Sequence, residues 1–277
     1  MLDTLVAPDF ETVASPGTAQ LRLGVKDFTY HMILLHYTES GSDVSVANMK
    51  TAIEEIRVEI DSREQWKLSG AQLLAFNEHL GQGAGTAGYL PLFLAAPNLP
   101  GPAVAEALAW GTQNVGNLTV KVKIASGRTS PALTATVMGR VEARPLGKIL
   151  QLDSSNLTPK ASNTYFKLPS QEDNGRPLVA MLAETTAMTK VSYQIGQRFI
   201  LQDVPIADLN VIYNAGERLK SVSGFSIVNF AMTGDVSKDP VPIFADGVPL
   251  INQTASLFMT STSSFDALTV LLGEARV

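Results

Sequence analysis

The chain has 277 residues, of which 45% are hydrophobic and 17% are charged. This composition is typical of a well-buried globular protein and excludes a disordered one, and the length accommodates two domains of ordinary size. The net charge of −5 argues against a nucleic-acid interface built on a broad basic surface. The absence of cysteine excludes a disulfide framework and thiolate chemistry.

The N-terminal sequence MLDTLVAPDFETVASPG has neither a basic start nor a long apolar core, so no secretory signal is predicted. No run of 18 apolar residues occurs, so no membrane-spanning segment is predicted either. We expect residues 1–19 to form an arm without an obvious partner strand. Such an arm is either frayed or docked on a neighbouring molecule.

The first predicted elements are strands. One starts over residues 21–23, and a second covers 28–37, which is rich in β-branched and aromatic residues. Apolar and charged residues alternate over Ile56–Asp61, which indicates a half-buried strand. Ser69 is a favourable N-cap and Gly81 a favourable C-terminal stop for a helix with one apolar stripe.

A glycine-rich segment follows this helix. Gly83, Gly85 and Gly88 spell G-x-G-x-x-G, the spacing of a dinucleotide-binding fingerprint. That fingerprint must follow a strand and open a helix. Here it follows a helix and leads into the apolar run 89–95, so we interpret it as a loop.

The later elements are again strands. Residues 118–124 and 133–137 alternate in the same way as the earlier strands, and residues 146–163 are interpreted as a connector. Further strands are predicted over 165–168, 177–183, 191–196, 225–232, 255–259 and 268–272.

The chain contains an internal repeat. Ile56–Gly81 and Val191–Gly216 share an alternating strand, a possible cap and a glycine stop, with Asp203 as the expected second cap. Their register is ungapped, and Ile60 and Ile195 are 135 positions apart (195 − 60). The same offset relates Ala132-Leu133-Thr134 to Ala267-Leu268-Thr269. The repetition at two distant places predicts two copies of one domain.

These patterns predict an all-β fold. Short strands at regular spacing, with about eight strands in each copy, favour two tandem eight-stranded jelly-roll β-sandwiches with short helices in the loops. The expected domains are an N-terminal arm over 1–19, a first jelly roll over 20–145, a connector over 146–163 and a second jelly roll over 164–277.

No pattern indicates catalysis. His31 and His36 lie on opposite faces of one strand and cannot share a metal ion, and His79 stands alone on a helix. All three are interpreted as surface or packing residues. We predict no catalytic residue, no cofactor-binding residue and no enzyme activity, and we leave metal ligands unassigned.

Two other residue types allow alternatives. The adjacent carboxylates Glu54-Glu55 and Glu172-Asp173 are interpreted as solvated, with a structural calcium ion at a subunit contact as the other reading. Trp66 and Trp110 could form a sugar-binding platform, but core positions are favoured.

The chain resembles one known family by a pattern of segments. IRVEID, the following turn with Arg63, and WKLSGAQLLAFNEHLG resemble the first jelly roll of corticovirus-type double jelly-roll major capsid proteins, which are kin to the tectivirus and adenovirus capsid lineage. HMILLHYT, LTVKVKI and the second copy occur in matching order, so the resemblance covers about residues 20–277. The loops between Gly81 and Leu118 and over 233–247 depart from it most.

The resemblance implies a structural major capsid protein of an icosahedral bacteriophage with an internal membrane. Homotrimers would imitate a hexagon and tile the shell. The implied partners are neighbouring capsomers, a penton or spike protein, and the underlying viral membrane or its proteins, without sequence-specific nucleic-acid binding. The implied location is the virion capsid, assembled in the host cytoplasm.

Two other classes stay open at this point. One is a tandem β-sandwich spike or a carbohydrate- or receptor-binding protein, which would expose an aromatic cluster. The other is a double jelly-roll glycan hydrolase, which would need paired carboxylates facing a cleft.

Overall fold

The structure of the chain, a computed structural model, describes residues 2–95, 106–142, 144–159, 163–166, 178–195, 197–216, 218–230, 244–245, 248–249, 253–259 and 263–276. The chain divides into two units. Unit 1 comprises Met1–Glu78, Gln82–Asp153 and Glu274–Val277, and unit 2 comprises His79–Gly81 and Ser154–Gly273.

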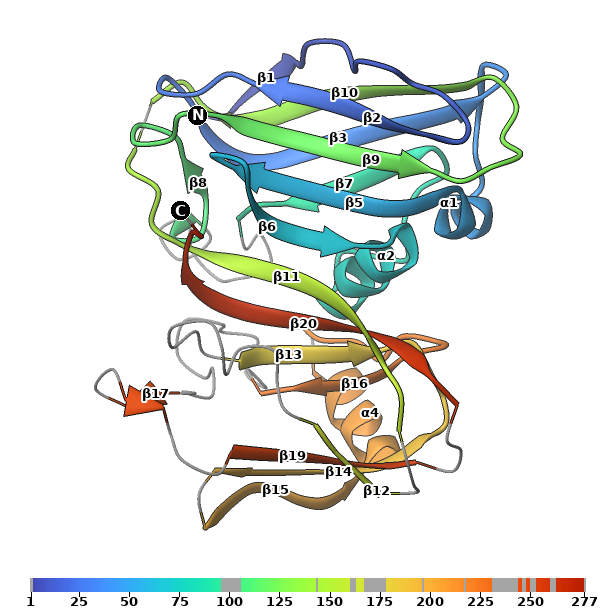
Figure 1. Ribbon diagram of the computed structural model, residues 1–277, viewed down its shortest axis with the longest axis vertical. Helices are drawn as coiled ribbons and strands as arrows, with labels where there is room; N and C mark the ends of the chain where they lie inside the picture. Colours follow the sequence, from blue (N-terminus) through green and yellow to red (C-terminus); the bar gives the residue numbers. More distant parts are fainter. Residues whose placement is uncertain are drawn as a thin grey trace. The chain divides into compact units, whose positions relative to one another are not determined.

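One sheet of unit 1 is entirely antiparallel (Figure 1). Its order is β1-β10-β3-β4, and β7 and β8 also pair with β3. The strands are β1 (Asp3–Val6), β3 (Thr29–Glu39), β4 (Ser42–Asp43), β7 (Tyr89–Phe93), β8 (Trp110–Gly111) and β10 (Pro131–Arg140). Burial alternates along β10, as the period-two pattern of its sequence predicts.

The second sheet of unit 1 has the order β11-β6-β5-β9-β2. It contains β2 (Gly17–Leu23), β5 (Ile53–Ile60), β6 (Arg63–Leu68), β9 (Leu118–Ile124) and the beginning of β11 (Lys148–Leu157). β6 pairs with β11 in parallel, through Leu152 opposite Trp66 and Asp153 opposite Lys67. The other neighbours are antiparallel.

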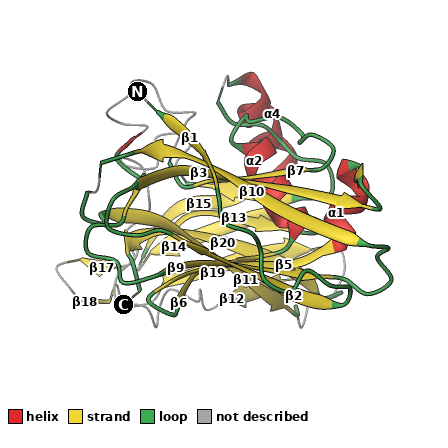
Figure 2. Cartoon of the chain, turned by 90° about the horizontal axis from the view of Figure 1, so that it is seen from above, coloured by secondary structure: helices red, strands yellow, loops and turns green. Residues whose placement is uncertain are grey.

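Short helices flank the strands of unit 1 (Figure 2). Ser45 caps α1 (Val46–Ala52) by accepting a hydrogen bond from the Asn48 amide. Ser69 and Gln72 form a capping box at the start of α2 (Gly70–His79): the Ser69 hydroxyl accepts from the Gln72 amide, and the Gln72 side chain accepts from the Ser69 amide. Ser69 is therefore the cap that the sequence predicts.

The predicted single apolar stripe of α2 understates its burial. Asn77 lies on the predicted stripe and is buried, and Gln72, which lies outside the stripe, is buried as well. Both are tolerated because each satisfies a backbone group: Gln72 closes the capping box, and the Asn77 amide donates to the Pro91 carbonyl at 2.8 Å. A pattern of apolar residues alone does not reveal the burial of Gln72.

Unit 2 also has two main sheets. One has the order β16-β13-β20 followed by the end of β11, and the other has the order β12-β19-β14-β15. The strands are β12 (Asn163–Phe166), β13 (Leu178–Ala183), β14 (Met188–Ile195), β15 (Arg198–Pro205), β16 (Ser226–Asn229), β19 (Gln253–Met259) and β20 (Phe265–Glu274). β17 (Phe244–Ala245) pairs antiparallel with β18 (Val248–Pro249), and α4 covers Ile206–Ala215.

The two units repeat one topology. The bounds of β14 and β19 are those of β5 and β9 displaced by 135 positions (188 − 53 and 253 − 118). The order β6-β5-β9-β2 returns as β15-β14-β19-β12, and β1-β10-β3-β7 returns as β11-β20-β13-β16. The predicted duplication and all-β double jelly roll are thus confirmed, and β11 is the counterpart of β1.

The N-terminal arm differs from its prediction. Residues 3–6 form β1, which pairs with β10, and the Ala7 amide donates to the Ala135 carbonyl at 3.0 Å. The Ser15 hydroxyl donates to the Ala125 carbonyl at 2.7 Å. The expectation of an arm without a partner strand is therefore wrong, because a four-residue strand is too short to show a period of two.

The domain boundaries also differ from those expected. The proposed connector, 146–163, contains β11, one of the long strands of the fold. The chain end returns to unit 1, where buried Gln65 exchanges hydrogen bonds with the backbone of Arg276 at 2.8 and 2.9 Å. Buried Gln151 donates to the Glu274 carbonyl at 2.9 Å. Side chains far away in the sequence therefore hold these last residues.

Asp203 does not cap α4, so this prediction is wrong. It lies in β15, where its φ is 51° and its amide donates to the Ser192 hydroxyl at 2.8 Å. α4 begins after Pro205 without a side-chain cap. Gly216 ends the helix as expected.

Asp61, the last residue of the IRVEID segment, fixes the turn after β5. It adopts a φ of 49°, and one carboxylate oxygen accepts from the amides of Gly116 and Asn117 at 2.8 and 2.7 Å. Aspartate tolerates this left-handed conformation better than most residues. Its carboxylate ties the β5–β6 turn to the segment that enters β9.

We predict that Asp61→Ala lowers the free energy of unfolding by about 1–3 kcal/mol, because two amides lose a charged acceptor and alanine is strained at positive φ. Urea denaturation of the purified protein measures the loss. Asp61→Asn retains an acceptor and the turn preference, so it should lose less. Equal losses in the two variants would contradict the role assigned to the carboxylate.

Candidate assembly surface

Apolar side chains reach the surface in a few places on the described residues. They are Leu2, Leu5 and Val6 at the N-terminus, Val141 after β10, Phe199 and Ile200 on β15, and Val211 and Ile212 on α4. Most lie on β1, β15 or the residues adjoining them, at the outer strands of two sheets. Large apolar groups at a sheet edge are typical of surfaces that bind another protein.

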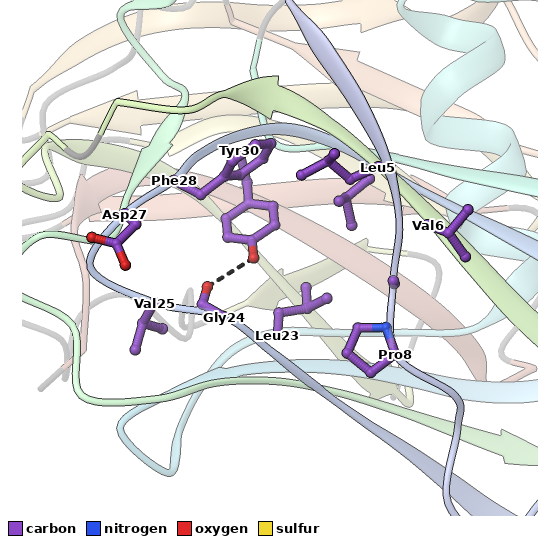
Figure 3. Close-up of a pocket in the computed structure, with 11 residues that line it drawn as sticks. Leu5, Val6, Pro8, Leu23, Gly24, Val25, Asp27, Phe28 and Tyr30 are labelled. Atoms are coloured by element: carbon purple, nitrogen blue, oxygen red, sulfur yellow. Dashed lines mark hydrogen bonds between the residues drawn. The ribbon is translucent and has the colours of Figure 1, made fainter.

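The exposed residues of β1 adjoin a hollow in unit 1. Its volume is about 240 Å³, and its walls are mainly apolar (Figure 3). Leu5 and Val6 line one side, and Leu23, Val25, Phe28, Tyr30 and Val137 contribute to the rest. The Tyr30 hydroxyl donates to the Gly24 carbonyl at 2.7 Å, and burial raises the Tyr30 pKa to about 12. The hollow extends the apolar surface beside β1.

The outer face of β5 and β9 has a different character. Lys121 pairs with Glu59 at 2.8 Å, Lys123 with Glu54 at 2.7 Å, and Arg57 with Glu55 at 2.6 Å. These ion pairs cross between neighbouring positions of a solvated sheet, where each contributes little to stability. Glu54 and Glu55 thus each contact a cation from their own unit.

Metal binding gains no support from the described residues. Among them, no three side chains of His, Cys, Asp or Glu gather closely enough to hold an ion. Glu172 and Asp173 lie outside the described residues, so the structural calcium ion stays a prediction. Likewise, no helix in the described ranges is both long and apolar enough to cross a membrane.

The histidines occupy packing and surface positions. His31 is buried on β3, and desolvation lowers its pKa despite the opposing charge of Glu106. His36 is partly exposed on the same strand, contacts Asp43 at 2.7 Å and stacks on Tyr89. The two rings therefore have different surroundings, as the strand period predicts.

His79 is fully buried in unit 2. Its Nδ1 lies 2.6 Å from the Lys220 carbonyl, and its Nε2 lies 2.9 Å from the Asn229 side-chain nitrogen. The ring packs edge-on against Tyr213. A neutral ring that donates through Nδ1 and accepts at Nε2 satisfies both contacts, and burial lowers the His79 pKa to about 4.

Both tryptophans lie in the core of unit 1, as favoured from the sequence. Trp66 and Trp110 are each 1% exposed and pack edge to face at 5.8 Å. The Trp66 indole donates to the Leu150 carbonyl at 2.7 Å. Neither ring is available as a sugar platform.

The glycine-rich segment is a structural loop between α2 and β7. Gly88 has a φ of 77°, and a Cβ there would lie 2.9 Å from the Asp43 side chain. Its amide donates to the Val44 carbonyl, and its carbonyl accepts from the Tyr37 amide, both at 2.7 Å. The segment leads into a strand and not a helix, which agrees with the rejection of a nucleotide fingerprint.

Solved structures with the same fold are viral capsid proteins. The chain is 17% identical to the major capsid protein P2 of bacteriophage PM2, with a TM-score of 0.85 over 100% of this chain and 98% of that one. It is 11% identical to the major capsid protein of Sulfolobus turreted icosahedral virus, with a TM-score of 0.67 over 99% and 97%. For PBCV-1 VP54, fitted into a reconstruction of the virophage Sputnik, the identity is 10% and the TM-score 0.66 over 100% and 97%. The fold is that of the double jelly-roll capsid proteins.

The sequence itself also matches a family of this class. Residues 4–140 match the model of the viral coat protein P2 N-terminal domain. No curated protein sequence matches the chain. The N-terminal half of the chain is therefore similar to the P2 family of viral coat proteins, and the fold of the whole chain is that of the double jelly-roll capsid proteins.

We predict that acid destabilises the protein through His79. The unfolded ring binds a proton near pH 6.5 and the folded ring near pH 4, so the unfolded state binds more protons between these values. The contribution of neutral His79 to the free energy of unfolding is therefore fully present above about pH 6.5. It decreases as the pH falls toward 4, by at most about 3 kcal/mol. The urea midpoint measured across this range should fall accordingly.

The matched variants are His79→Gln and Tyr213→Phe. The first should flatten the acid dependence because it removes the titrating ring. The second should lower stability at every pH and keep the slope, because it removes only the hydroxyl that accepts from the Asn229 amide at 2.8 Å. An unchanged slope in His79→Gln would show that another group is responsible.

Proposed function

We propose that the chain is the major capsid protein of an icosahedral bacteriophage with an internal membrane, and that three copies form one pseudo-hexagonal capsomer. The observation that carries this proposal is the repeated topology of units 1 and 2. Two similar units per chain and three chains per ring provide six similar lobes. A near-hexagonal building block covers a closed shell with few kinds of contact.

The partners follow from this role. Neighbouring capsomers would meet along the sides of the hexagon, a penton or spike protein would occupy the vertices, and the viral membrane or its proteins would lie beneath. Assembly would take place in the host cytoplasm. The net charge of −5 agrees with the absence of a broad nucleic-acid-binding surface.

The expected species in solution is a trimer, with a mass three times the 29.6 kDa of one chain. Light scattering coupled to size-exclusion chromatography measures this mass, and negative-stain images of the same fraction should show particles with hexagonal outlines. A monomer at micromolar concentration would contradict the trimer. A monomer that binds glycans would instead favour a spike or carbohydrate-binding protein.

A further inference from the structure

We propose that β15 of one copy of the chain pairs in parallel with β1 of the next copy, so that each contact in the ring repeats the pairing of β6 with β11. This inference rests on the proposed trimer and names the surface that forms it.

The topology supplies the first argument. β15 is the counterpart of β6, and β1 is the counterpart of β11. In unit 1, β6 does not end its sheet, because β11 pairs with it in parallel through Leu152 and Trp66. The chain therefore already contains one contact between a β6-type strand and a β1-type strand. The same two types of strand occur once more, as β15 and β1, without such a contact among the described residues.

Burial supplies the second argument. Gln65 and Trp66, on the covered strand β6, are 0% and 1% exposed. In the 135-residue register, Ile200 is the counterpart of Gln65 (200 − 65), and it is 38% exposed beside Phe199 at 45%. On the β1 side, Leu5 and Val6 are 46% and 86% exposed, whereas Leu150 and Leu152 of β11 are buried. The apolar positions are uncovered where the partner strand is missing.

The backbone supplies the third argument. In the described part of the chain, β1 pairs with β10 alone and β15 with β14 alone, and each strand ends its sheet. The outer amides and carbonyls of such strands favour pairing with another strand. Phe199 and Ile200 would bring apolar side chains to Leu5, Val6 and the hollow beside them. A second copy of the same chain satisfies both edges at once.

The contact is heterologous, because it joins different strands of the two copies. Each copy offers one β1 edge and one β15 edge, so each copy binds two neighbours, and three copies close into a ring with no edge of either kind left over. The alternative result of a heterologous contact is an open filament, in which cross-linked species would be larger than a trimer.

Engineered cysteines test the contact directly, because the chain has no cysteine of its own. Adjacent strands lie about 4.8 Å apart, which is within the Cα separation that a disulfide spans. We would combine Ile200→Cys with Leu5→Cys in one variant and with Val6→Cys in another, since successive strand residues point to opposite faces. On oxidation, one of the two variants should form a covalent trimer on non-reducing gels, with no larger species.

The matched control combines Ile200→Cys with Thr18→Cys, an exposed position on β2 in the other sheet of unit 1. It should remain monomeric on the same gels. A ladder beyond the trimer would overturn the closed ring. If scattering shows a trimer but neither β1 variant cross-links more than the control, the pairing is wrong and the proposed trimer survives. A monomer by scattering would instead overturn the trimer itself.

A charge substitution gives an independent readout that needs no disulfide. Ile200→Asp should raise the dissociation constant of the trimer at least about tenfold, because it places a carboxylate in the apolar contact. Val211→Asp, on the exposed surface of α4, should leave the constant unchanged. Circular dichroism verifies that both variants fold. An equal effect of the two substitutions would contradict the assignment of β15 to the contact.

Discussion

The outer edges of the sheets are the constraint on which the rest of this structure depends. A strand that ends a sheet leaves amides and carbonyls without a partner in the sheet, and this chain covers one such edge by pairing β6 with β11. The contact is buried and hydrogen-bonded. Trp66 lies in the core and donates to the Leu150 carbonyl, and the amide side chains of Gln65 and Gln151 are fully buried beside it. It is also a parallel pairing, which needs a long crossover between the two strands.

Because the jelly roll is duplicated, the chain contains a second strand of each of these two types. A single jelly roll would offer one strand of each type, and a chain with two offers the same two types twice. One pair, β6 and β11, is joined within the chain. The remaining pair, β15 and β1, carries much of the exposed apolar surface of the described residues. In the proposed ring, these two open strands are complementary to those of another copy.

The buried polar residues also join segments that are far apart in the sequence. Gln65 and Gln151 hold the backbone of the last residues, and His79 links Lys220 and Asn229. In the interior, each of these groups would cost stability without its partner. Their hydrogen-bond partners come from remote parts of the sequence. A local sequence pattern therefore shows each of these residues only as an isolated polar residue. This is why neither glutamine was singled out from the sequence.

The sequence by itself determined most of the strands, the helix that Ser69 caps, the core tryptophans and the duplication, because alternation and caps are local properties and the repeat keeps one register. It did not determine that residues 3–6 form a strand, that β11 runs through the expected connector, or that Asp203 belongs to β15. Those outcomes depend on pairing between segments far apart in the chain. Only the tertiary structure decided which edges are covered and which remain open, because coverage is a property of two strands together and not of either sequence alone.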